Sequence, residues 1–349
     1  MPWQETATAS GETMTIATPP LRIGILSTAN IGRHFIAGCA GSDRAAIVAV
    51  ASRGQEAAEA FAAKNGVPRA LGSYEALLAD PEVEAIYNPL PNSLHAEWTI
   101  KALEAGKHVL CEKPIAVTAA DARAMFAAAD RAGRLLVEAF PYRSQPQTHA
   151  LARLISGGEI GKPRMIQAGF GFPVADPANI RLDPVLGGGA LLDAGSYAVS
   201  LIRMLAGEAP TQVSAFAQWT ERGVDSSLIA NLEFPSGLVA QAACTFGTGI
   251  YRHALIVCES GVVRTDFRNN LTDADPGVLE VQRGGWELKT EQLDFPRSNG
   301  FRAEAESFAD AVRQGPAAWN GIGPAESIEV MAVLEAIITS AREGRPIAL

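Results

Sequence analysis

Short apolar segments alternate with helix-length segments through the first 140 residues, and this alternation restricts the fold more than any other feature. Apolar runs of strand length occupy residues 21–26, 46–51, 83–87, 107–111 and 135–139. The segments between them carry helix signals, such as Thr118 at the start of one helix and Gly133 at its end. Strands joined by helical crossovers form parallel sheets. The sequence therefore predicts an open α/β sheet in this part of the chain.

The turn after the first strand has the pattern of a phosphate-binding loop with altered glycine positions. Ser27, Ala29 and Gly32 take the three glycine positions of G-x-G-x-x-G. Small residues still let the backbone approach a pyrophosphate, and the next helix offers free N–H groups at its start. Taken alone, the loop fits an ordinary strand–helix turn equally well. The residues assigned here to cofactor binding are Ser27, Thr28, Ala29, Asn30 and Ile31.

Ser52 and Arg53 follow the second strand, at the place that distinguishes NAD from NADP in many dinucleotide-binding folds. An enzyme selective for NAD usually carries an acid there, which binds the 2′-hydroxyl of the ribose. This chain has no acid at that point, and a hydroxyl with a guanidinium suits a 2′-phosphate. The competing interpretation is a solvated arginine that opens the next helix. The pair favours NADP over NAD.

A buried strand ends abruptly at Glu112, Lys113 and Pro114. The carboxyl ends of strands in open α/β sheets face the ligand site, and Pro114 disfavours helical geometry at Lys113. The ammonium group of Lys113 can therefore project into a cleft. An isolated Glu-Lys-Pro is more often an exposed charged turn, so this prediction depends on the rest of the chain.

The strand 83–87 runs into a turn with two prolines that ends at Asn92. Asn92 is a favourable N-cap for a helix over residues 93–105. His95 lies in the first turn of that helix, where the positive end of the helix dipole disfavours imidazolium. We expect His95 to be a neutral packing or hydrogen-bonding residue rather than a general base.

After residue 140 the pattern changes to extended segments joined by turns. These segments occupy residues 164–172, 212–220, 226–234, 238–246, 253–259, 262–267, 279–281 and 286–293. Neighbouring strands joined by short turns pair antiparallel. The sequence predicts an α+β domain over residues 141–349, with a large, open, mostly antiparallel sheet and two closing helices that can pack back on the first domain. Residues 1–20 are expected to form a flexible N-terminal arm.

A helix predicted over residues 190–205 follows three glycines and carries Asp193 and Tyr197 on one face, because they lie four residues apart. A tyrosine beside a lysine can give and take a proton, since a nearby cation favours the phenolate. Taken alone, a core tyrosine and a helix-face charge explain this pair more simply.

Together these features resemble the Gfo/Idh/MocA oxidoreductase family. The matching motifs are GILSTANIG (24–32), YNPLPNSLH (87–95), GKHVLCEKP (106–114), EAFPYR (138–143) and GGGALLDAGSY (187–197). The resemblance extends over residues 21–349. It is strongest to the branch that includes NADP-dependent D-xylose dehydrogenases, dimeric dihydrodiol dehydrogenases and glucose–fructose oxidoreductase, which has tyrosine at the position of Tyr197 where much of the family has histidine.

The resemblance implies an N-terminal Rossmann dinucleotide-binding domain over residues 21–140 and a C-terminal domain that binds substrate and forms oligomers. It implies that Lys113 and Tyr197 are the catalytic pair, that Asp193 orients Lys113 or substrate hydroxyls, and that Arg143 and Arg181 line the substrate pocket. It also implies a cis Lys113–Pro114 peptide. The further cofactor-binding residues in these motifs are Ser52, Arg53, Pro89, Leu90, Asn92, His95, Glu112 and Lys113. Relatives usually have histidine where this chain has Gln145, so contact of Gln145 with substrate would change specificity.

The function expected from these features is an NADP-dependent oxidoreductase of the aldose 1-dehydrogenase type. A dihydrodiol dehydrogenase and a keto-sugar reductase are alternatives within the same class. The alternative from another class is a non-catalytic NADP-binding regulator, which the presence of both Lys113 and Tyr197 disfavours.

Composition excludes several other partners and sites. The formal net charge of -9 argues against nucleic acid or an anionic membrane as the main partner. The four cysteines form no Cys-x-x-Cys pair, so we expect no metal site and reduced, buried thiols. We expect no apolar run to span a bilayer, and residues 1–20 lack the features of a secretion signal. We therefore expect a cytoplasmic protein, and the family resemblance implies that it is a homodimer or homotetramer.

Overall fold

The computed structural model describes residues 19–284, 287 and 289–349. Its N-terminal part contains a six-stranded parallel sheet with the order β3-β2-β1-β4-β5-β6. The strands are β1 (Leu21–Leu26), β2 (Ala45–Ala51), β3 (Ala70–Leu71), β4 (Ala85–Asn88), β5 (His108–Glu112) and β6 (Leu136–Ala139). The strand order reverses between β1 and β4, and such a switch point is where open α/β sheets bind ligands. The predicted Rossmann architecture is confirmed.

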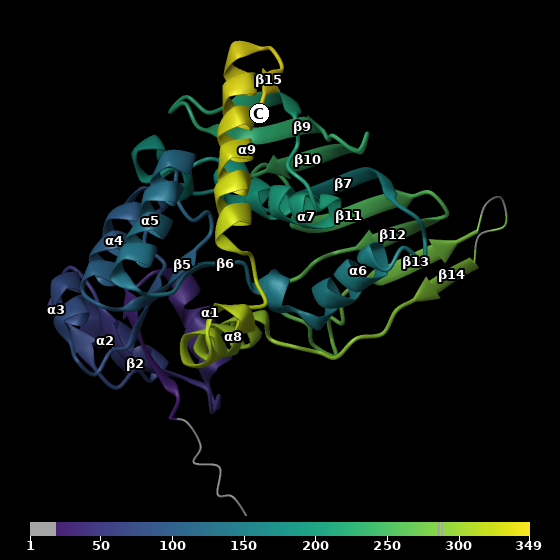
Figure 1. Ribbon diagram of the computed structural model, residues 1–349. Coiled ribbons are helices and arrows are strands. Elements are labelled where there is room, and N and C mark those ends of the chain that lie inside the picture. The colour runs from purple at the N-terminus through teal and green to yellow at the C-terminus, as the bar shows by residue number, and fades with distance from the viewer. Residues whose placement is uncertain (1–18, 285–286, 288) are drawn as a thin grey trace, which may run out of the picture.

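The crossover helices cover both faces of this sheet (Figure 1). They are α1 (Asn30–Cys39), α2 (Gln55–Asn65), α3 (Tyr74–Ala79), α4 (His95–Glu104) and α5 (Ala119–Ala132). Thr118 accepts the Asp121 N–H at the start of α5, and Gly133 ends the helix in the left-handed conformation, as the sequence indicated. The predicted capping role of Asn92 is wrong. Its amide instead donates to the Gly187 carbonyl oxygen at 2.8 Å, and a single 3-10 turn, Asn92–Leu94, precedes α4.

The C-terminal part contains a nine-stranded sheet with the order β14-β13-β12-β11-β7-β10-β9-β8-β15. The strands are β7 (Pro163–Gly171), β8 (Gln212–Trp219), β9 (Asp225–Glu233), β10 (Val239–Thr245), β11 (Tyr251–Cys258), β12 (Gly261–Thr265), β13 (Leu279–Arg283), β14 (Lys289–Gln292) and β15 (Ile347–Ala348). All neighbours pair antiparallel except β7 and β10, which are parallel. The mostly antiparallel sheet is therefore confirmed, with one parallel pair at its centre.

Four helices complete this part of the chain: α6 (Pro146–Ser156), α7 (Ser196–Ala206), α8 (Gly300–Gln314) and α9 (Pro324–Glu343). Helix α7 packs on β7 and β10, and α9 contacts both β8 and α5. Helix α8 packs against α1 of the first sheet. The long α9 thus lies between α5 of the first part and the second sheet, and its contacts link the two parts (Figure 1).

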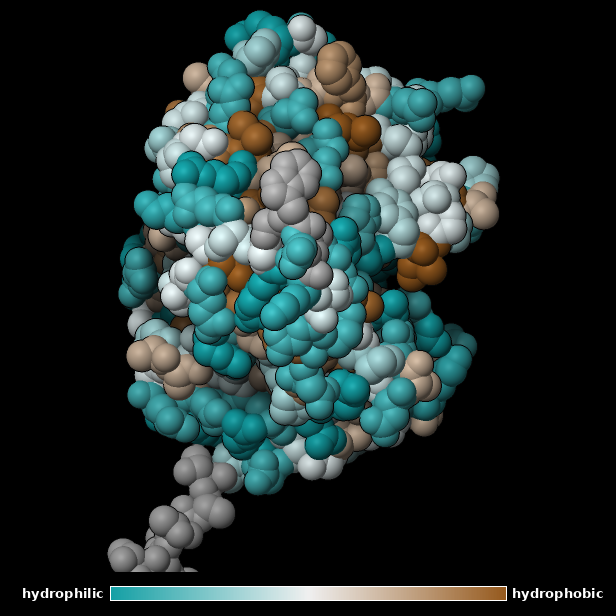
Figure 2. Space-filling model, turned by 90° about the vertical axis from the view of Figure 1, so that its right-hand side faces the viewer, coloured by the Kyte–Doolittle hydropathy of each residue, from teal (hydrophilic) through white to brown (hydrophobic). Residues whose placement is uncertain are grey.

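The surface around the β13–β14 hairpin is mostly hydrophilic, with hydrophobic residues in separate small areas (Figure 2). All four cysteines are buried and unpaired. Contrary to expectation, one helical run, Pro184–Ala206, is long and apolar enough to cross a membrane by length and composition. Of its most apolar 18-residue window, 67% is buried inside the protein. The run carries Asp193 and Tyr197, and its apolar residues pack in the core.

Candidate active site

A cleft of about 350 Å³ lies at the carboxyl ends of β1, β4 and β5, and the second sheet closes its other side. The first part of the chain contributes Ala29, Asn30, Ile31, Pro89, Leu90, Pro91, Asn92, His95, Glu112 and Lys113. The second part contributes Phe170, Phe172, Ile180, Arg181, Leu186, Gly187, Gly188, Gly189, Asp193, Tyr197 and Asn269. The cleft therefore brings the two sequence motifs around Lys113 and Tyr197 together.

The loop after β1 is shaped to accept a phosphate group. Ser27 has a φ of 76°, so it adopts the left-handed conformation that the first glycine of the fingerprint usually supplies. Its hydroxyl accepts the Ala29 N–H at 3.2 Å and its N–H donates to the Ala51 carbonyl at the end of β2. No side chain caps α1. The Gly32 N–H donates to the Ala29 carbonyl oxygen at 3.0 Å, so the N–H groups before Gly32 in the first turn of α1 are the ones available to an anion.

Ser52 and Arg53 follow β2, beside the phosphate loop. Ser52 is buried and its N–H donates to the Leu71 carbonyl oxygen at 3.0 Å. Arg53 is exposed and forms no ion pair with any described residue. Neither residue lines the cleft itself, but the hydrogen bond from Ser27 to Ala51 keeps the two loop ends adjacent. A guanidinium at this position can bind an anionic group of a ligand that extends beyond the phosphate loop.

Lys113 forms a buried ion pair with Asp193. Its Nζ donates to Asp193 Oδ1 at 2.5 Å and to the Asp193 carbonyl oxygen at 2.9 Å, and the side chains are 11% and 17% exposed. Arg181 Nε donates to the other carboxylate oxygen. Burial alone would raise the pKa of Asp193, but the two cations lower it to about 2. Burial would likewise lower the pKa of Lys113, yet the neighbouring acids raise it, so Lys113 is a charged ammonium.

Tyr197 lies beside this ion pair, with Lys113 Nζ 5.1 Å from the centre of its ring. Its hydroxyl oxygen accepts a hydrogen bond from Asn269 Nδ2 at 3.1 Å. Burial raises the pKa of Tyr197, while Lys113, Arg252 and the Asn269 amide oppose that rise. Tyr197 is therefore a neutral phenol that can donate a proton, next to cations that stabilise its phenolate.

Buried polar contacts hold the turns on the other side of the cleft. His95 joins two of them, because Nδ1 lies 2.9 Å from the Pro114 carbonyl oxygen and Nε2 lies 2.8 Å from that of Leu90. Burial lowers the pKa of His95 to about 4, so the ring is neutral. Glu112 accepts the Tyr87 hydroxyl at 2.5 Å. His95 is thus a structural residue of the cleft wall.

Two residues that the sequence suggested for the pocket lie outside it. Arg143 is buried, and its guanidinium donates to the Ser200 carbonyl oxygen at 3.2 Å and to Glu326 at 3.0 Å. These bonds occupy the guanidinium in the interior between α7 and α9, so the structure does not bring it to the cleft. Gln145 is fully buried and donates to backbone carbonyl oxygens, so it does not line the cleft either.

The structure adds four residues that the sequence analysis missed. Phe170 and Phe172 line the cleft from the end of β7 and the residue after it, and their alternation on the predicted strand was a usable signal. Asn269 comes from a loop without any motif. Arg252 stacks on Tyr197 from the start of β11, with its guanidinium carbon 4.3 Å from the ring centre.

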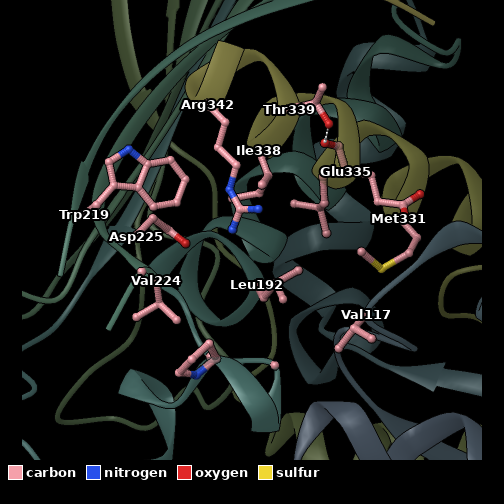
Figure 3. Close-up of a pocket in the computed structure, with 15 residues that line it drawn as sticks. Val117, Leu192, Trp219, Val224, Asp225, Met331, Glu335, Ile338, Thr339 and Arg342 are labelled. Atoms are coloured by element: carbon pink, nitrogen blue, oxygen red, sulfur yellow. Dashed lines mark hydrogen bonds between the residues drawn. The ribbon is translucent and has the colours of Figure 1, made fainter. Parts of the chain in front are cut away.

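A second cavity of about 350 Å³ lies behind the glycine loop, and Gly187 and Gly188 line both this cavity and the cleft. Asp225 and Trp219 lie on one side, and Arg342 extends from α9 toward them (Figure 3). Asp225 is buried and accepts the Leu191 N–H at 2.7 Å. A side chain at Gly189 would collide with the Asp225 carboxylate. Asp225 therefore fixes the start of the helical run that carries Asp193 and Tyr197.

Comparison with known proteins shows which family has this architecture. Residues 21–140 match the family described as the oxidoreductase family with an NAD-binding Rossmann fold, Gfo/Idh/MocA. Residues 148–264 match the C-terminal domain of the same family. The chain belongs to the Gfo/Idh/MocA oxidoreductase family. It is therefore an NAD(P)-dependent oxidoreductase that acts on CH–OH groups.

Several members of the Gfo/Idh/MocA family are similar to the chain over nearly its whole length. D-xylose 1-dehydrogenase (NADP(+)) 2 of Haloferax volcanii is 35% identical, covering 94% of this chain and 100% of its own. Trans-1,2-dihydrobenzene-1,2-diol dehydrogenase of Danio rerio is 32% identical, covering 84% of this chain and 89% of its own. The crystal structure of the aldose-aldose oxidoreductase from Caulobacter crescentus, complexed with glycerol, has a TM-score of 0.85 and 28% identity. That match covers 95% of this chain and 100% of the other.

The Gfo/Idh/MocA assignment confirms the family resemblance of the sequence motifs. The Lys113–Pro114 peptide is cis, as the resemblance implied. The names of these related proteins give D-xylose, a trans-dihydrobenzenediol and aldoses as their substrates.

Proposed function

We propose that this protein is an NADP-dependent dehydrogenase that oxidises an aldose at its anomeric carbon, with Lys113 and Tyr197 as the catalytic pair. The observation that carries the proposal is the placement of a charged Lys113, paired with Asp193, beside the hydroxyl-bearing Tyr197 in one cleft at the sheet's switch point. The names of the xylose dehydrogenase and the aldose-aldose oxidoreductase support an aldose as substrate.

The residues at the cleft fit NADP. The small residues Ser27 and Ala29 leave room for the pyrophosphate, and the first turn of α1 has no side-chain cap that would compete with it. Arg53 is exposed next to this loop and would hold the 2′-phosphate. When bound, NADP supplies the acceptor of the hydride. The other residues proposed to bind it are Thr28, Asn30, Ile31, Ser52, Pro89, Leu90, Asn92, His95, Glu112 and Lys113.

Residues of the chain itself take up the proton of the substrate hydroxyl and stabilise the negative charge that develops on its oxygen. The substrate hydroxyl binds between Tyr197 and Lys113. The Tyr197 phenol first loses its own proton to water, and the phenolate then takes the substrate proton as the hydride leaves the same carbon. Lys113 stabilises the alkoxide that develops, because a buried cation acts strongly in a site from which water is excluded. Asp193 keeps Lys113 in place and, with Arg181, binds the other substrate hydroxyls.

A trans-dihydrodiol substrate is the second candidate. Phe170 and Phe172 line the cleft, and their rings are 5.4 Å apart, which would suit a flat apolar ring next to the reacting hydroxyl. The dihydrodiol dehydrogenase relatives support this candidate. A regulator without activity is disfavoured because the ion pair and Tyr197 are both intact in the cleft.

We also infer that the protein acts in the cytoplasm as a homodimer or homotetramer through the outer face of the second sheet. Phe216 and Ile229 are directly paired on β8 and β9 and are 80% and 49% exposed. Ala243 of β10 continues this row beside Ile229. A contiguous apolar row on a sheet face is typical of an interaction surface.

The test is NADPH formation by the purified protein, followed by absorbance, with aldoses, dihydrodiols and polyols in turn. We expect turnover of an aldose with NADP preferred over NAD. Tyr197→Phe should lower kcat by about 10²–10⁴-fold, the range for loss of a positioned acid or base. Tyr251→Phe, which removes a hydroxyl outside the cleft, is the matched control. Wild-type turnover by the Tyr197→Phe variant would remove Tyr197 from the mechanism.

A further inference from the structure

We propose that Asn269, oriented by Arg252 and held by Gln145, is a positioning residue that stabilises the Tyr197 phenolate and leaves its oxygen free to take the substrate proton. The inference rests on the proposed role of Tyr197 as the proton acceptor. Gln145 lies more than 100 residues before Arg252 and Asn269 in the sequence, and the three residues form one connected set of contacts next to Tyr197.

The hydrogen bonds fix the direction in which the Asn269 amide points. Arg252 Nη2 lies 3.3 Å from Asn269 Oδ1, and a guanidinium can only donate. The Asn269 oxygen therefore faces Arg252, and its NH₂ group faces the Tyr197 oxygen at 3.1 Å. Because Asn269 donates this bond, it uses a lone pair of the Tyr197 oxygen and does not occupy the hydroxyl hydrogen. The Asn269 N–H stabilises the phenolate that forms when this hydrogen leaves, and the other lone pairs of the phenolate oxygen remain free to accept the substrate hydroxyl.

The backbone of Asn269 is held by groups outside the cleft. The buried Gln145 Nε2 donates to the Asn269 carbonyl oxygen and, at 3.1 Å, to that of Ser298. The Gly300 N–H donates to the same Asn269 carbonyl at 2.8 Å. Gln145 thus contributes to the site through the loop that it anchors, although it lies outside the cleft.

Arg252 places a second cation against Tyr197 in an apolar setting. Its guanidinium carbon lies 4.3 Å from the Tyr197 ring centre and 4.7 Å from the centres of Phe170 and Phe267. Its Nε is buried and has no hydrogen-bond partner among the described residues. A cation enclosed by aromatic rings is poorly screened by water, so its field acts strongly on the neighbouring phenol.

The other ionisable groups around Tyr197 act in both directions. Lys113 from the end of β5 favours the phenolate, and Glu112 from the same strand end opposes it. Tyr87 at the end of β4 and Tyr142 in the turn after β6 are buried and neutral. Asn269 is the described group that donates a hydrogen bond to the Tyr197 oxygen itself. Removal of this donor should therefore act directly on the Tyr197 oxygen and raise the pKa of its hydroxyl.

The test compares Asn269→Asp with the wild-type protein. The new side chain has nearly the same shape and can keep its contact with Arg252, but a carboxylate cannot donate to the Tyr197 oxygen and adds a negative charge next to it. Tyrosine labelled with carbon-13 at Cζ reports ionisation of each of the five tyrosines by NMR, and Tyr197→Phe assigns the resonance. We expect Asn269→Asp to raise the titration midpoint of Tyr197 by about one pH unit or more, because the charged form loses its donor.

Activity provides a second readout. The rise of kcat with pH should move to higher pH by a similar amount in Asn269→Asp, while KM changes little. Arg252→Lys should shift the midpoint less than Arg252→Met, because the lysine keeps the charge. Asn231→Asp, at an exposed position of β9, is the control for an added charge far from Tyr197. Asn269→Ala, which removes the donor without adding charge, decides the question if the aspartate variant does not fold.

An unchanged Tyr197 midpoint in folded Asn269→Asp and Asn269→Ala variants would overturn the inference. The NMR titration does not depend on turnover. If the wild-type protein oxidises no sugar, the proposed function fails while the titration still tests the influence of Asn269 on Tyr197.

Discussion

Replacement of Glu138 by glutamine should remove part of the pH dependence of stability between pH 4.5 and 7. Glu138 lies on β6 and is almost completely buried. Its Oε1 accepts the Ile115 N–H at 2.8 Å, in the turn that follows Lys113 and Pro114, and its Oε2 is buried without a hydrogen-bond partner among the described residues. Glutamine keeps the acceptor for Ile115 and cannot ionise.

The expected magnitude follows from the pKa of Glu138. Burial raises this pKa from its ordinary value of 4.5 to about 7, although Ser327, the Ile115 N–H and Arg143 act in the opposite direction. The folded protein therefore holds the proton more tightly than the unfolded chain does. The resulting stabilisation is complete below pH 4.5 and is lost as the pH rises to about 7. The shift corresponds to about 3 kcal/mol of the free energy of unfolding.

The assay is urea unfolding of the wild-type protein and Glu138→Gln over this pH range, with Glu97→Gln as the control because the Glu97 side chain is 51% exposed. The free energy of unfolding of Glu138→Gln minus that of the wild type should rise by about 3 kcal/mol as the pH increases from 4.5 to 7. The control should show no such trend. A constant difference between Glu138→Gln and wild type at all pH values would refute the argument that a buried, protonated carboxyl supports the turn after Lys113.

Three further substitutions test other parts of the account. Arg53→Ala should lower kcat/KM for NADP about tenfold and leave that for NAD unchanged, since an exposed guanidinium contributes a partly screened bond to the 2′-phosphate. Asp225→Ala should cost about 1–3 kcal/mol in urea unfolding, because the Leu191 N–H loses its acceptor, and should lower kcat as the start of the catalytic helix loosens. Arg143→Met should destabilise the fold by about 3–5 kcal/mol by leaving Glu326 unpaired, with KM for the sugar unchanged in the folded fraction.

The sequence predicted the elements of the fold well because their signals are local. Alternating strands and helices, together with caps such as Thr118, identify the crossover topology of the first sheet. The two-residue strands β3 and β15 are too short to produce a periodic pattern. The parallel pairing of β7 with β10 joins strands separated by α7, β8 and β9, so no local turn signal reports it.

The candidate site was predictable where a residue follows a strand end or a glycine loop, as Lys113, Asp193 and Tyr197 do. It was not predictable where the partner lies far along the chain. Arg143 has the residue type of a sugar ligand, but its contact with Glu326 on α9 keeps it in the interior. Asn269 reaches the cleft from an irregular loop that long-range bonds hold in place, so no periodicity or motif marks it.

The most direct test of the central claim is to follow the hydride itself. An aldose that carries deuterium at its anomeric carbon is incubated with the protein and NADP, and the nicotinamide product is analysed by NMR. The account predicts that deuterium appears at C4 of the nicotinamide with the wild-type protein and that the transfer is slowed by about 10²–10⁴-fold in Tyr197→Phe. Absence of deuterium transfer from every aldose tested would contradict the claim that the cleft around Lys113 and Tyr197 is an aldose dehydrogenase site.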